Sequence, residues 1–409
     1  MVPNGWNLIT LDELKSDKLS YGANSPSCEL KENGARYIRI TDIDDMGNLN
    51  SSAVGIDSDD YEDYLLEDKD FLFARSGNTV GKTFLYEKDK HPKAAYAGYL
   101  IRYRANKEKL NPQYLKQFCF SNRYHFWIKS QIRAGAQPNI NAKEYGSLEL
   151  PLPPLPEQRK IAQILSTWDR GIATTEKLID ASKQQKKALM QQLLTGKKRL
   201  VDPETGKVFE GEWEEVKLND LALYRRGSFP QPYGNPEWVD EVNGYPFIQV
   251  FDIDKNMKLK KATKTKISDA AIDKSVFIEA GTVIVSLQGS IGRVAITQYD
   301  AYVDRTVLLF QSFKRKMDTI YFAYAIQELF EIEKEKAPGG TIKTITKQVL
   351  SNFTIKVPTH YEQQKIASVL TAADKDIELL EAKLAHLKQE KKALMQQLLT
   401  GKHRVSLSS

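Results

Sequence analysis

The same twelve residues, KKALMQQLLTGK, occupy positions 186–197 and 391–402 of this chain of 409 residues. The offset between the two copies is 391 − 186 = 205 residues. A repeat at a long fixed period indicates that one structural unit occurs twice, which limits the folds and functions that fit the chain. The sequence therefore predicts a tandem duplication.

The duplication extends upstream of the repeat with decreasing similarity. At the same offset, residues 157–162 (EQRKIA) match residues 362–367 (EQQKIA). Further upstream the match needs small gaps, but Trp6 returns as Trp213. Two near-identical helical segments thus alternate with two diverged globular units. Such a pattern is expected if the helices do one shared task and the globular units do two different ones.

Each helical segment has one apolar seam, whose positions alternate in steps of three and four residues as in a coiled coil. Such a seam predicts helices of about 35–40 residues, roughly 50–60 Å long at 1.5 Å per residue, and Gly196 and Gly401 are expected to end them. The seam residues predicted to pair the helices are Leu165, Trp168, Ile172, Ile179, Leu189 and Leu193 in the first copy and Leu370, Ile377, Leu380, Leu384, Leu387, Leu394 and Leu398 in the second.

Two arrangements of these helices are open. Each helix could pack on its own globular unit, although ordinary core helices usually have only about 8–20 residues. The helices could instead pair antiparallel, because residues 201–357 lie between them and can carry the chain back. We expect the second arrangement, an α+β fold in which two α/β globular domains alternate with two long helices that form a pseudo-two-fold symmetric antiparallel coiled coil. The predicted boundaries are 1–152 and 201–357 for the globular domains and 153–200 and 358–405 for the helices.

Composition narrows the class of protein. The chain has 41% apolar residues, its length suffices for two or three domains, and no apolar run approaches the roughly 18 residues that a membrane span needs. The first residues lack the architecture of a signal peptide. Cys28 and Cys119 lie far apart in the sequence and the histidines are scattered, so we expect reduced thiols, no metal site and a cytoplasmic location.

Charge is unevenly distributed along the first half. Residues 75–143 carry fourteen basic and three acidic side chains, whereas residues 42–70 carry eleven acidic side chains and one basic side chain. A domain so polarised is expected to turn a basic face toward a polyanion and an acidic side away from it. Clustering of ordinary solvated surface charge would give the same counts. Aromatic side chains lie among the basic ones at Arg102 and Arg104, which suits phosphate contacts with stacking beside them.

One segment imitates a phosphate-binding loop. Residues 77–83 (GNTVGKT) have three residues between the glycines where a P-loop has four, and the FLY that follows predicts a strand where a P-loop opens a helix. We therefore reject nucleotide binding. The equivalent segment of the second half is 288–293 (QGSIGR), and both segments are predicted hairpin tips whose basic residue could contact DNA, although ordinary β-turns fit equally well.

Two polar loops, residues 133–141 (RAGAQPNIN) and 339–346 (GGTIKTIT), precede the helices. Arg, Gln and Asn side chains can read base edges and Lys and Thr can contact phosphates or bases, although loop capping is an equal alternative. The candidate DNA contacts from these patterns are Arg75, Ser76, Thr79, Lys82, Arg102, Arg104, Arg133, Gln137, Asn139, Gln288, Ser290, Arg293, Thr341 and Lys343.

No catalytic set is found. The sequence contains no G-x-G-x-x-G, H-E-x-x-H or G-x-S-x-G motif, no Asn- or Asp-Pro-Pro-aromatic motif of an amino methyltransferase, and no carboxylate cluster repeated in both halves. Residues 42–47 lack the ligands of a calcium loop. We therefore expect no catalytic, cofactor-binding or metal-binding residues.

Residues 152–162 (LPPLPEQRKIA), followed by the long helix that ends in LLTGK, resemble the specificity subunit of Type I restriction-modification systems. The pattern recurs at 357–402, so the resemblance covers the whole chain. It implies a non-catalytic subunit without cofactors that selects a bipartite, asymmetric sequence in double-stranded DNA for two methyltransferase subunits and two ATP-driven restriction subunits. In this family each globular domain is a target recognition domain that reads one half-site, while the paired helices set the spacing and dock the methyltransferases.

The residues themselves agree with this resemblance. Two globular domains related by a two-fold axis would contact half-sites about one helical turn, roughly 34 Å, apart, and the site should not be palindromic because the domains differ. Two other functions stay open at this point. One is a stand-alone DNA-binding regulator on the same scaffold, with no methyltransferase partner. The other is an NTP-using enzyme built on residues 77–83, whose ATP affinity would be lost in Lys82→Ala.

Overall fold

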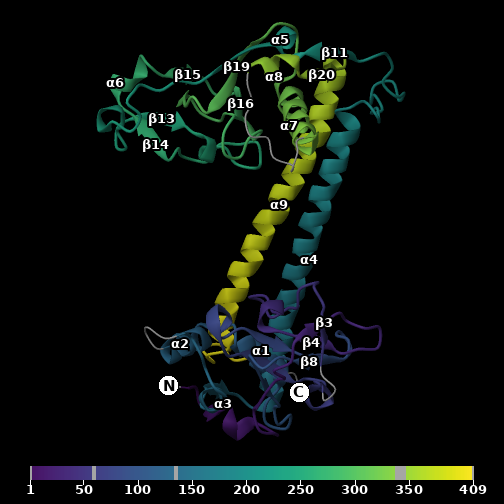
Figure 1. Cartoon of the computed structure of the whole chain (residues 1–409), viewed down its shortest axis with the longest axis vertical. Coiled ribbons are helices and arrows are strands. Elements are labelled where there is room, and N and C mark those ends of the chain that lie inside the picture. The colour runs from purple at the N-terminus through teal and green to yellow at the C-terminus, as the bar shows by residue number, and fades with distance from the viewer. Residues whose placement is uncertain (1, 58–60, 133–136, 337–346, 408–409) are drawn as a thin grey trace. The chain divides into compact units, whose positions relative to one another are not determined.

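The computed structural model describes residues 2–57, 61–132, 137–336 and 347–407, without the side chains of 334–336 and 347–349 (Figure 1). It divides into two compact units. The first unit comprises Met1–Glu176 and Lys383–Ser409, and the second comprises Lys177–Ala382. The repeat at 391–402 therefore belongs to the first unit and the repeat at 186–197 to the second. Each helix ends in the unit that contains the other half's globular domain.

Two long helices, α4 (Leu155–Leu193) and α9 (His360–Leu398), have 39 residues each, which confirms the predicted length. Gly196 and Gly401 follow them with φ of +72° and +69°, a left-handed conformation that glycine adopts without steric cost. The helices are antiparallel. In the first unit Lys391 Nζ of α9 lies 2.5 Å from Asp169 Oδ1 of α4, and in the second unit Lys186 Nζ of α4 lies 2.6 Å from Asp374 Oδ1 of α9.

The predicted seam residues are buried or half-buried throughout. The buried ones are Leu165, Ile172, Ile179, Leu193, Leu370, Ile377 and Leu398. The half-buried ones are Trp168, Leu189, Leu380, Leu384, Leu387 and Leu394. At the helix ends the seam also enters the globular cores, where Leu165 and Leu398 share one core and Leu193 and Leu370 share another. Packing of each helix on its own globular domain, which the sequence left as the alternative to pairing, thus describes the helix starts, whereas the C-terminal end of each helix packs in the other domain's core.

The first globular part contains two four-stranded sheets and one strand pair. β1 (Asn7–Thr10) pairs antiparallel with β10 (Glu149–Leu152), the strand that leads into α4. One sheet has the order β2 (Ser20–Tyr21), β9 (Leu100–Tyr103), β6 (Phe71–Ala74), β7 (Thr83–Leu85), and the other β3 (Ser27–Cys28), β5 (Gly55–Ile56), β4 (Arg36–Ile38), β8 (Ala94–Tyr96). The helices are α1 (Pro112–Phe118), α2 (Asn122–Gln131) and α3 (Ala142–Gly146), and the short 3-10 turns are η1 (Asp12–Leu14), η2 (Ile40–Asp42), η3 (Tyr61–Tyr64) and η4 (Gly77–Thr79).

The second globular part repeats this plan. β11 (Glu214–Lys217) pairs with β20 (Thr354–Val357) ahead of α9. Its sheets have the orders β12 (Ala222–Arg226), β19 (Val307–Phe313), β16 (Val283–Ser286), β17 (Val294–Ile296) and β14 (Thr265–Ile267), β13 (Tyr245–Ile248), β18 (Ala301–Val303), β15 (Val276–Ile278). The other elements are α5 (Leu218–Leu221), α6 (Asp269–Ile272), α7 (Thr319–Lys336), α8 (Lys347–Asn352), η5 (Pro236–Trp238) and η6 (Val250–Asp252). Among the described strands, β4 pairs parallel with β8 and β13 pairs parallel with β18 at equivalent places, so the duplication extends to topology.

The apolar residues of the repeat complete the two main cores. Met395, Leu398 and Leu399 lie in the core that contains Ile161 at the start of α4. The same positions of the first copy, Met190, Leu193 and Leu194, lie in the core that contains Ile366 at the start of α9. The repeat is therefore constrained by packing against the similarly repeated helix starts.

Among the described residues, no helix combines the length and the apolar character that crossing a membrane requires. Cys119 is buried and Cys28 is half-buried, and both are free thiols.

Candidate nucleic-acid interface

The two predicted hairpin tips are present. β6 pairs antiparallel with β7, and β16 pairs antiparallel with β17. Residues 77–79 form a single 3-10 turn inside the first hairpin and not the start of a helix. This geometry is a strand-turn-strand, whereas a P-loop cradles phosphate at a helix N-terminus. The rejection of nucleotide binding at 77–83 therefore agrees with the fold.

The basic residue of each hairpin holds a neighbouring loop. Lys82 Nζ lies 2.9 Å from Asp45 Oδ1 and donates to the carbonyl oxygen of Ile43 at 3.2 Å. In the second unit Arg293 Nη1 donates to the carbonyl oxygen of Ile253 at 3.3 Å. These matched contacts give both cations a structural use that the sequence did not indicate, so they are weaker candidates for phosphate contact.

Arg102 and Arg104 are engaged by carboxylates. Arg102 Nη2 lies 3.2 Å from Asp17 Oδ2, and Arg104 Nε lies 2.8 Å from Oδ1 of Asp70, which is buried. Hydrogen bonding to Asp70 raises the pKa of Arg104 further. The expectation that the acidic stretch turns away from the basic one is wrong here, because charges from the two stretches pair in the fold. We do not retain these two arginines as proposed DNA contacts.

Other predicted residues of the first unit gather at one corner. The backbone N–H of Arg75 donates to the carbonyl oxygen of Tyr99 (3.0 Å), and the N–H of Ile140 donates to the carbonyl oxygen of Arg75 (2.9 Å). Ser76 forms a β-bridge with Asn139. The surface around this corner combines predicted polar residues with tyrosines that the sequence did not indicate. Its members are Tyr21, Arg75, Ser76, Gln137, Asn139 and Tyr99.

Tyr99 is 59% exposed, and Tyr21 lies beneath Arg75 with 4.7 Å between the guanidinium carbon and the ring centroid. Tyr99 lies in the turn between the apolar strands β8 and β9. An aromatic residue in such a turn was the sequence signal that could have indicated an exposed contact residue. Thr79 lies in the adjoining turn, where its Oγ1 donates to the carbonyl oxygen of Ser76 at 2.9 Å.

The second unit has the equivalent corner with different side chains. The N–H of Leu287 donates to the carbonyl oxygen of Thr306 at 2.8 Å, as Arg75 does to Tyr99 in the first unit. The predicted residues Gln288 and Ser290 are exposed beside it. Sequence reasoning missed Arg305, which is exposed next to Thr306.

Tyr233 lies under Arg305, with 5.1 Å from the guanidinium carbon to the ring centroid. Its hydroxyl donates to Asp304 Oδ2 at 2.5 Å and accepts from Gln249 Nε2 at 2.9 Å. Burial, followed by the hydrogen bond to Asp304, raises the pKa of Tyr233 to about 12. The phenol therefore stays protonated near neutral pH and the ring is held in one position.

Three predicted contacts, Arg133, Thr341 and Lys343, lie outside the described residues. Within the described ranges, no group of three or more His, Cys, Asp or Glu side chains could hold a metal ion.

A buried carboxylate anchors the helix ends in each unit. Glu157, 2% exposed, accepts from Arg404 Nε at 2.6 Å, from Arg404 Nη2 at 2.7 Å and from Trp6 Nε1 at 3.2 Å. Glu362 accepts from Arg199 Nε, Arg199 Nη2 and Trp213 Nε1 at 2.6, 2.7 and 3.2 Å. The two anchors hold the segment that follows one long helix against the start of the other.

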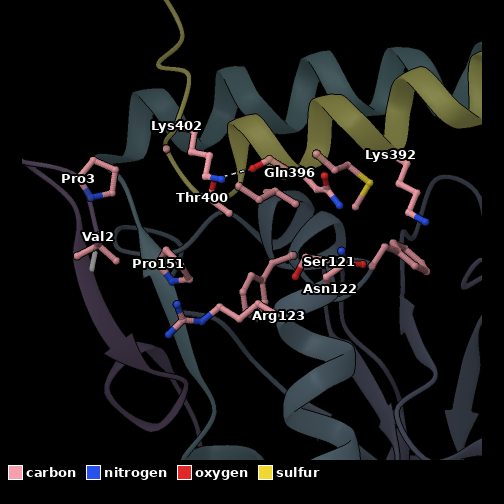
Figure 2. A pocket seen from close by; sticks show the side chains of 15 residues that line it. Val2, Pro3, Ser121, Asn122, Arg123, Pro151, Lys392, Gln396, Thr400 and Lys402 are labelled. Atoms are coloured by element: carbon pink, nitrogen blue, oxygen red, sulfur yellow. Dashed lines mark hydrogen bonds between the residues drawn. The ribbon is translucent and has the colours of Figure 1, made fainter.

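An apolar hollow adjoins the repeat in the first unit. It has a volume of about 500 Å³ and is walled by Met395 and Leu399 of the repeat and by Phe118. Figure 2 shows Lys392 and Gln396 of α9 on one side and Asn122 and Arg123 of α2 on the other. A hollow of about 250 Å³ in the second unit is lined by Lys187, Met190 and Gln191. These are the same repeat positions as Lys392, Met395 and Gln396.

The sequence profile described as "Type I restriction modification DNA specificity domain" matches residues 3–183 and again residues 210–389. The chain belongs to this family. Each match comprises one globular part and most of the helix that follows it, so the Type I specificity domain occurs here twice.

Two specificity subunits are similar to this chain over most of their length. The putative type I restriction enzyme MjaX specificity subunit of Methanocaldococcus jannaschii is 30% identical over 366 residues, which are 86% of this chain and 82% of that protein. The type I restriction enzyme MjaVIII specificity subunit of the same organism is 26% identical over 360 residues, 84% of this chain and 81% of that protein.

Solved structures support the fold of this Type I specificity-family chain. A chain from "Structural basis underlying complex assembly and conformational transition of the type I R-M system" superposes with a TM-score of 0.60 at 20% identity, covering 98% of this chain and 100% of that one. The Type I restriction-modification S subunit from M. genitalium gives a TM-score of 0.58 at 13% identity, covering 100% and 99%. Two globular parts alternating with two paired helices are thus the architecture of these structures as well.

Proposed function

We propose that this chain is the DNA specificity subunit of a Type I restriction-modification complex, which selects a bipartite, asymmetric sequence in double-stranded DNA and does no chemistry itself. The observation that carries this proposal is the match between the two units. Their anchors and helix ends correspond, and the sheet that contains the hairpin has the equivalent strand order in both units. The side chains at the equivalent corners differ. A common scaffold with two different surfaces suits one protein that reads two different half-sites.

The two equivalent corners, around Arg75 and Tyr99 in the first unit and around Leu287 and Thr306 in the second, are called here the recognition corners. Their polar side chains can form hydrogen bonds with DNA. Arginine, glutamine and asparagine side chains can bond to base edges in the major groove, while lysines elsewhere on the surface neutralise phosphates. Phosphate contacts make the affinity depend on salt, because binding releases counterions from DNA. The paired helices set the separation of the half-sites, and the complex acts on DNA in the cytoplasm.

The repeat supplies two equal docking surfaces. Lys187 and Lys392 are exposed, and each lines a hollow together with the methionine and the glutamine at the same repeat positions. One protein that binds both surfaces would bind twice. We therefore assign these surfaces to two copies of the methyltransferase subunit, and the full complex adds two restriction subunits.

An exchange of one globular part tests the reading of half-sites. Residues 1–152 are replaced by the corresponding part of another specificity subunit, and methylated positions are mapped across the genome of a host that carries the complex. One half of the methylated sequence should change while the other half and the spacing stay the same. A change in both halves, or in neither, would show that the modular assignment is wrong.

Charge reversal on the repeat tests docking. Lys187→Glu and Lys392→Glu should each reduce the number of bound methyltransferase subunits from two to one, and the double variant should bind none, as measured by native mass spectrometry. Lys255→Glu, an exposed lysine outside the helices, is the control that should still bind two. A chain that binds specific DNA tightly but never binds a methyltransferase would favour a stand-alone regulator instead.

A further inference from the structure

Five arginines in the described part of the chain lie over an aromatic ring, and two of them differ from the rest. Arg102, Arg199 and Arg404 also bind a carboxylate, at 3.2, 2.6 and 2.6 Å. Arg75 over Tyr21 and Arg305 over Tyr233 form no ion pair among the described residues. Each of these two guanidinium groups therefore lies against an aromatic ring and is left without an ion pair to a described carboxylate.

Both arginines lie at the equivalent corner of their unit. Arg75 is at the end of β6 and is joined through its backbone N–H to Tyr99, and Arg305 immediately precedes Thr306, which is joined in the same way to Leu287. Arg75 thus follows the hairpin strand of its corner, whereas Arg305 precedes the neighbouring strand of the equivalent corner.

A close backbone approach shows that the frame of this corner is shared. A Cβ atom on Gly22 would lie 2.2 Å from the carbonyl oxygen of Tyr96, and one on Gly227 would lie 2.1 Å from that of Val303. Such distances exclude any side chain, so each unit needs glycine at this position. The backbone is therefore constrained equally in both units while the side chains that it carries are free to differ.

A guanidinium stacked on a ring suits one kind of base contact. The group is planar, and stacking occupies its face but leaves the N–H groups in its plane. Two parallel N–H groups match the O6 and N7 acceptors of guanine in the major groove, the commonest specific contact of arginine with DNA. In the second unit the hydrogen bonds of Tyr233 to Asp304 and Gln249 fix the ring on which Arg305 rests.

We propose that Arg75 reads a guanine in the half-site of the first globular part and that Arg305 reads a guanine in the half-site of the second. This assignment rests on the proposed function, because it requires each globular part to meet one half-site.

Arginine-to-lysine substitution in the assembled methyltransferase complex tests the assignment, because lysine keeps the charge but loses the planar fork. Methylated positions are mapped in host DNA. Arg75→Lys should lower the preference for guanine at one position of one half-site by about 10- to 100-fold and leave the other half-site unchanged, and Arg305→Lys should do the reverse. Arg102→Lys, which is stacked but ion-paired, is the control that should leave both half-sites unchanged.

A second pair of variants guards against a general loss of binding. Arg75→Gln and Arg305→Gln should move the preference at the affected position from guanine toward adenine, since glutamine matches the adenine edge. Unchanged specificity, or equal weakening on all sequences, would overturn the proposal by showing that these arginines contact nothing or only phosphate. If the unaltered complex recognised no bipartite sequence, the proposed function itself would fail.

Discussion

At the scale of single residues, the buried carboxylates Glu157 and Glu362 connect parts of the chain that are far apart in sequence. Each is 2% exposed or less and accepts three N–H hydrogen bonds from an arginine and a tryptophan. A carboxylate removed from water is stable only when such donors replace its hydration. The anchor therefore makes the segment after each helix part of the unit's fold.

Neutralising one anchor should weaken one unit selectively. Glu157→Gln keeps the side-chain volume but removes the charge that Arg404 binds, and it should lower the free energy of opening the first unit by about 2 kcal/mol. Hydrogen-exchange mass spectrometry of the full chain can measure this, since it reports each unit separately. Glu362→Gln should have the equivalent effect in the second unit. Glu149→Gln, at an exposed position, should have little effect. Equal loss of protection in both units of Glu157→Gln would contradict the assignment.

At the scale of elements, a lysine lies within the helix seam in each unit. Lys391 is 5% exposed and binds Asp169, which also accepts from Gln117 at 2.7 Å. The pair of Lys186 and Asp374 repeats this contact in the second unit. Polar partners inside an apolar seam favour one register of two helices over others, because a shifted register would leave the charges unpaired.

A double-mutant cycle should separate register from stability. Lys391→Met leaves Asp169 without its cation and should lower the free energy of unfolding by about 1–3 kcal/mol, and Asp169→Leu should act similarly. The combined variant should recover the part of this loss that comes from the unpaired charge, because an apolar pair can replace a buried ion pair. The lost hydrogen bond from Gln117 to Asp169 is not recovered. Urea unfolding gives the four values. Lys388→Met removes a solvent-exposed pair with Glu176 and should cost less than about 1 kcal/mol. Additive effects of the two seam substitutions would argue against a coupled pair.

The elements were predictable to the degree that their pattern is local. The seam from Leu370 to Leu398 repeats over a whole helix, so the length and the pairing of the helices could be predicted. The shared use of Leu398 by the seam and a globular core could not, because one apolar residue gives the same signal in either setting. The recognition corner depends on contacts between residues far apart in sequence, such as Tyr233 with Asp304, and no periodicity connects them.

At the scale of the whole molecule, the first unit joins both ends of the described chain. Arg404 Nη1 donates to the carbonyl oxygen of Asn4 at 2.9 Å. In the second unit Arg199 Nη1 donates to the carbonyl oxygen of Gly211 at 2.8 Å, but there a continuous segment connects the helix to the following domain. The contact between residues 4 and 404 in the first unit therefore corresponds to a contact that a continuous segment spans in the second unit.

A circularly permuted chain should therefore keep the fold and the function. Residue 405 is joined to residue 3 by a short Gly-Ser linker, and the chain is opened between Glu204 and Thr205, which are exposed. The permuted protein should direct methylation to the same bipartite sequence, as mapped in host DNA. Opening the chain instead within α4, beside Ile179, should abolish folding, since it interrupts the seam. Loss of the methylated sequence in a permuted chain that folds would show that chain order matters.

Each copy of the repeat packs in the unit that contains the other half's globular domain. This arrangement has a consequence for how such a chain can evolve. Recombination between the gene segments that encode KKALMQQLLTGK would remove 205 residues and leave one globular part followed by one helix. That half-length product keeps Glu157 and, after its single remaining repeat, Arg404, but it loses Arg199. Glu157 and Arg404 would then lie at opposite ends of the same long helix. The carboxylate and the guanidinium could meet only between two copies of the product. A single genetic deletion would thus convert an asymmetric reader into a symmetric dimer that selects a palindrome.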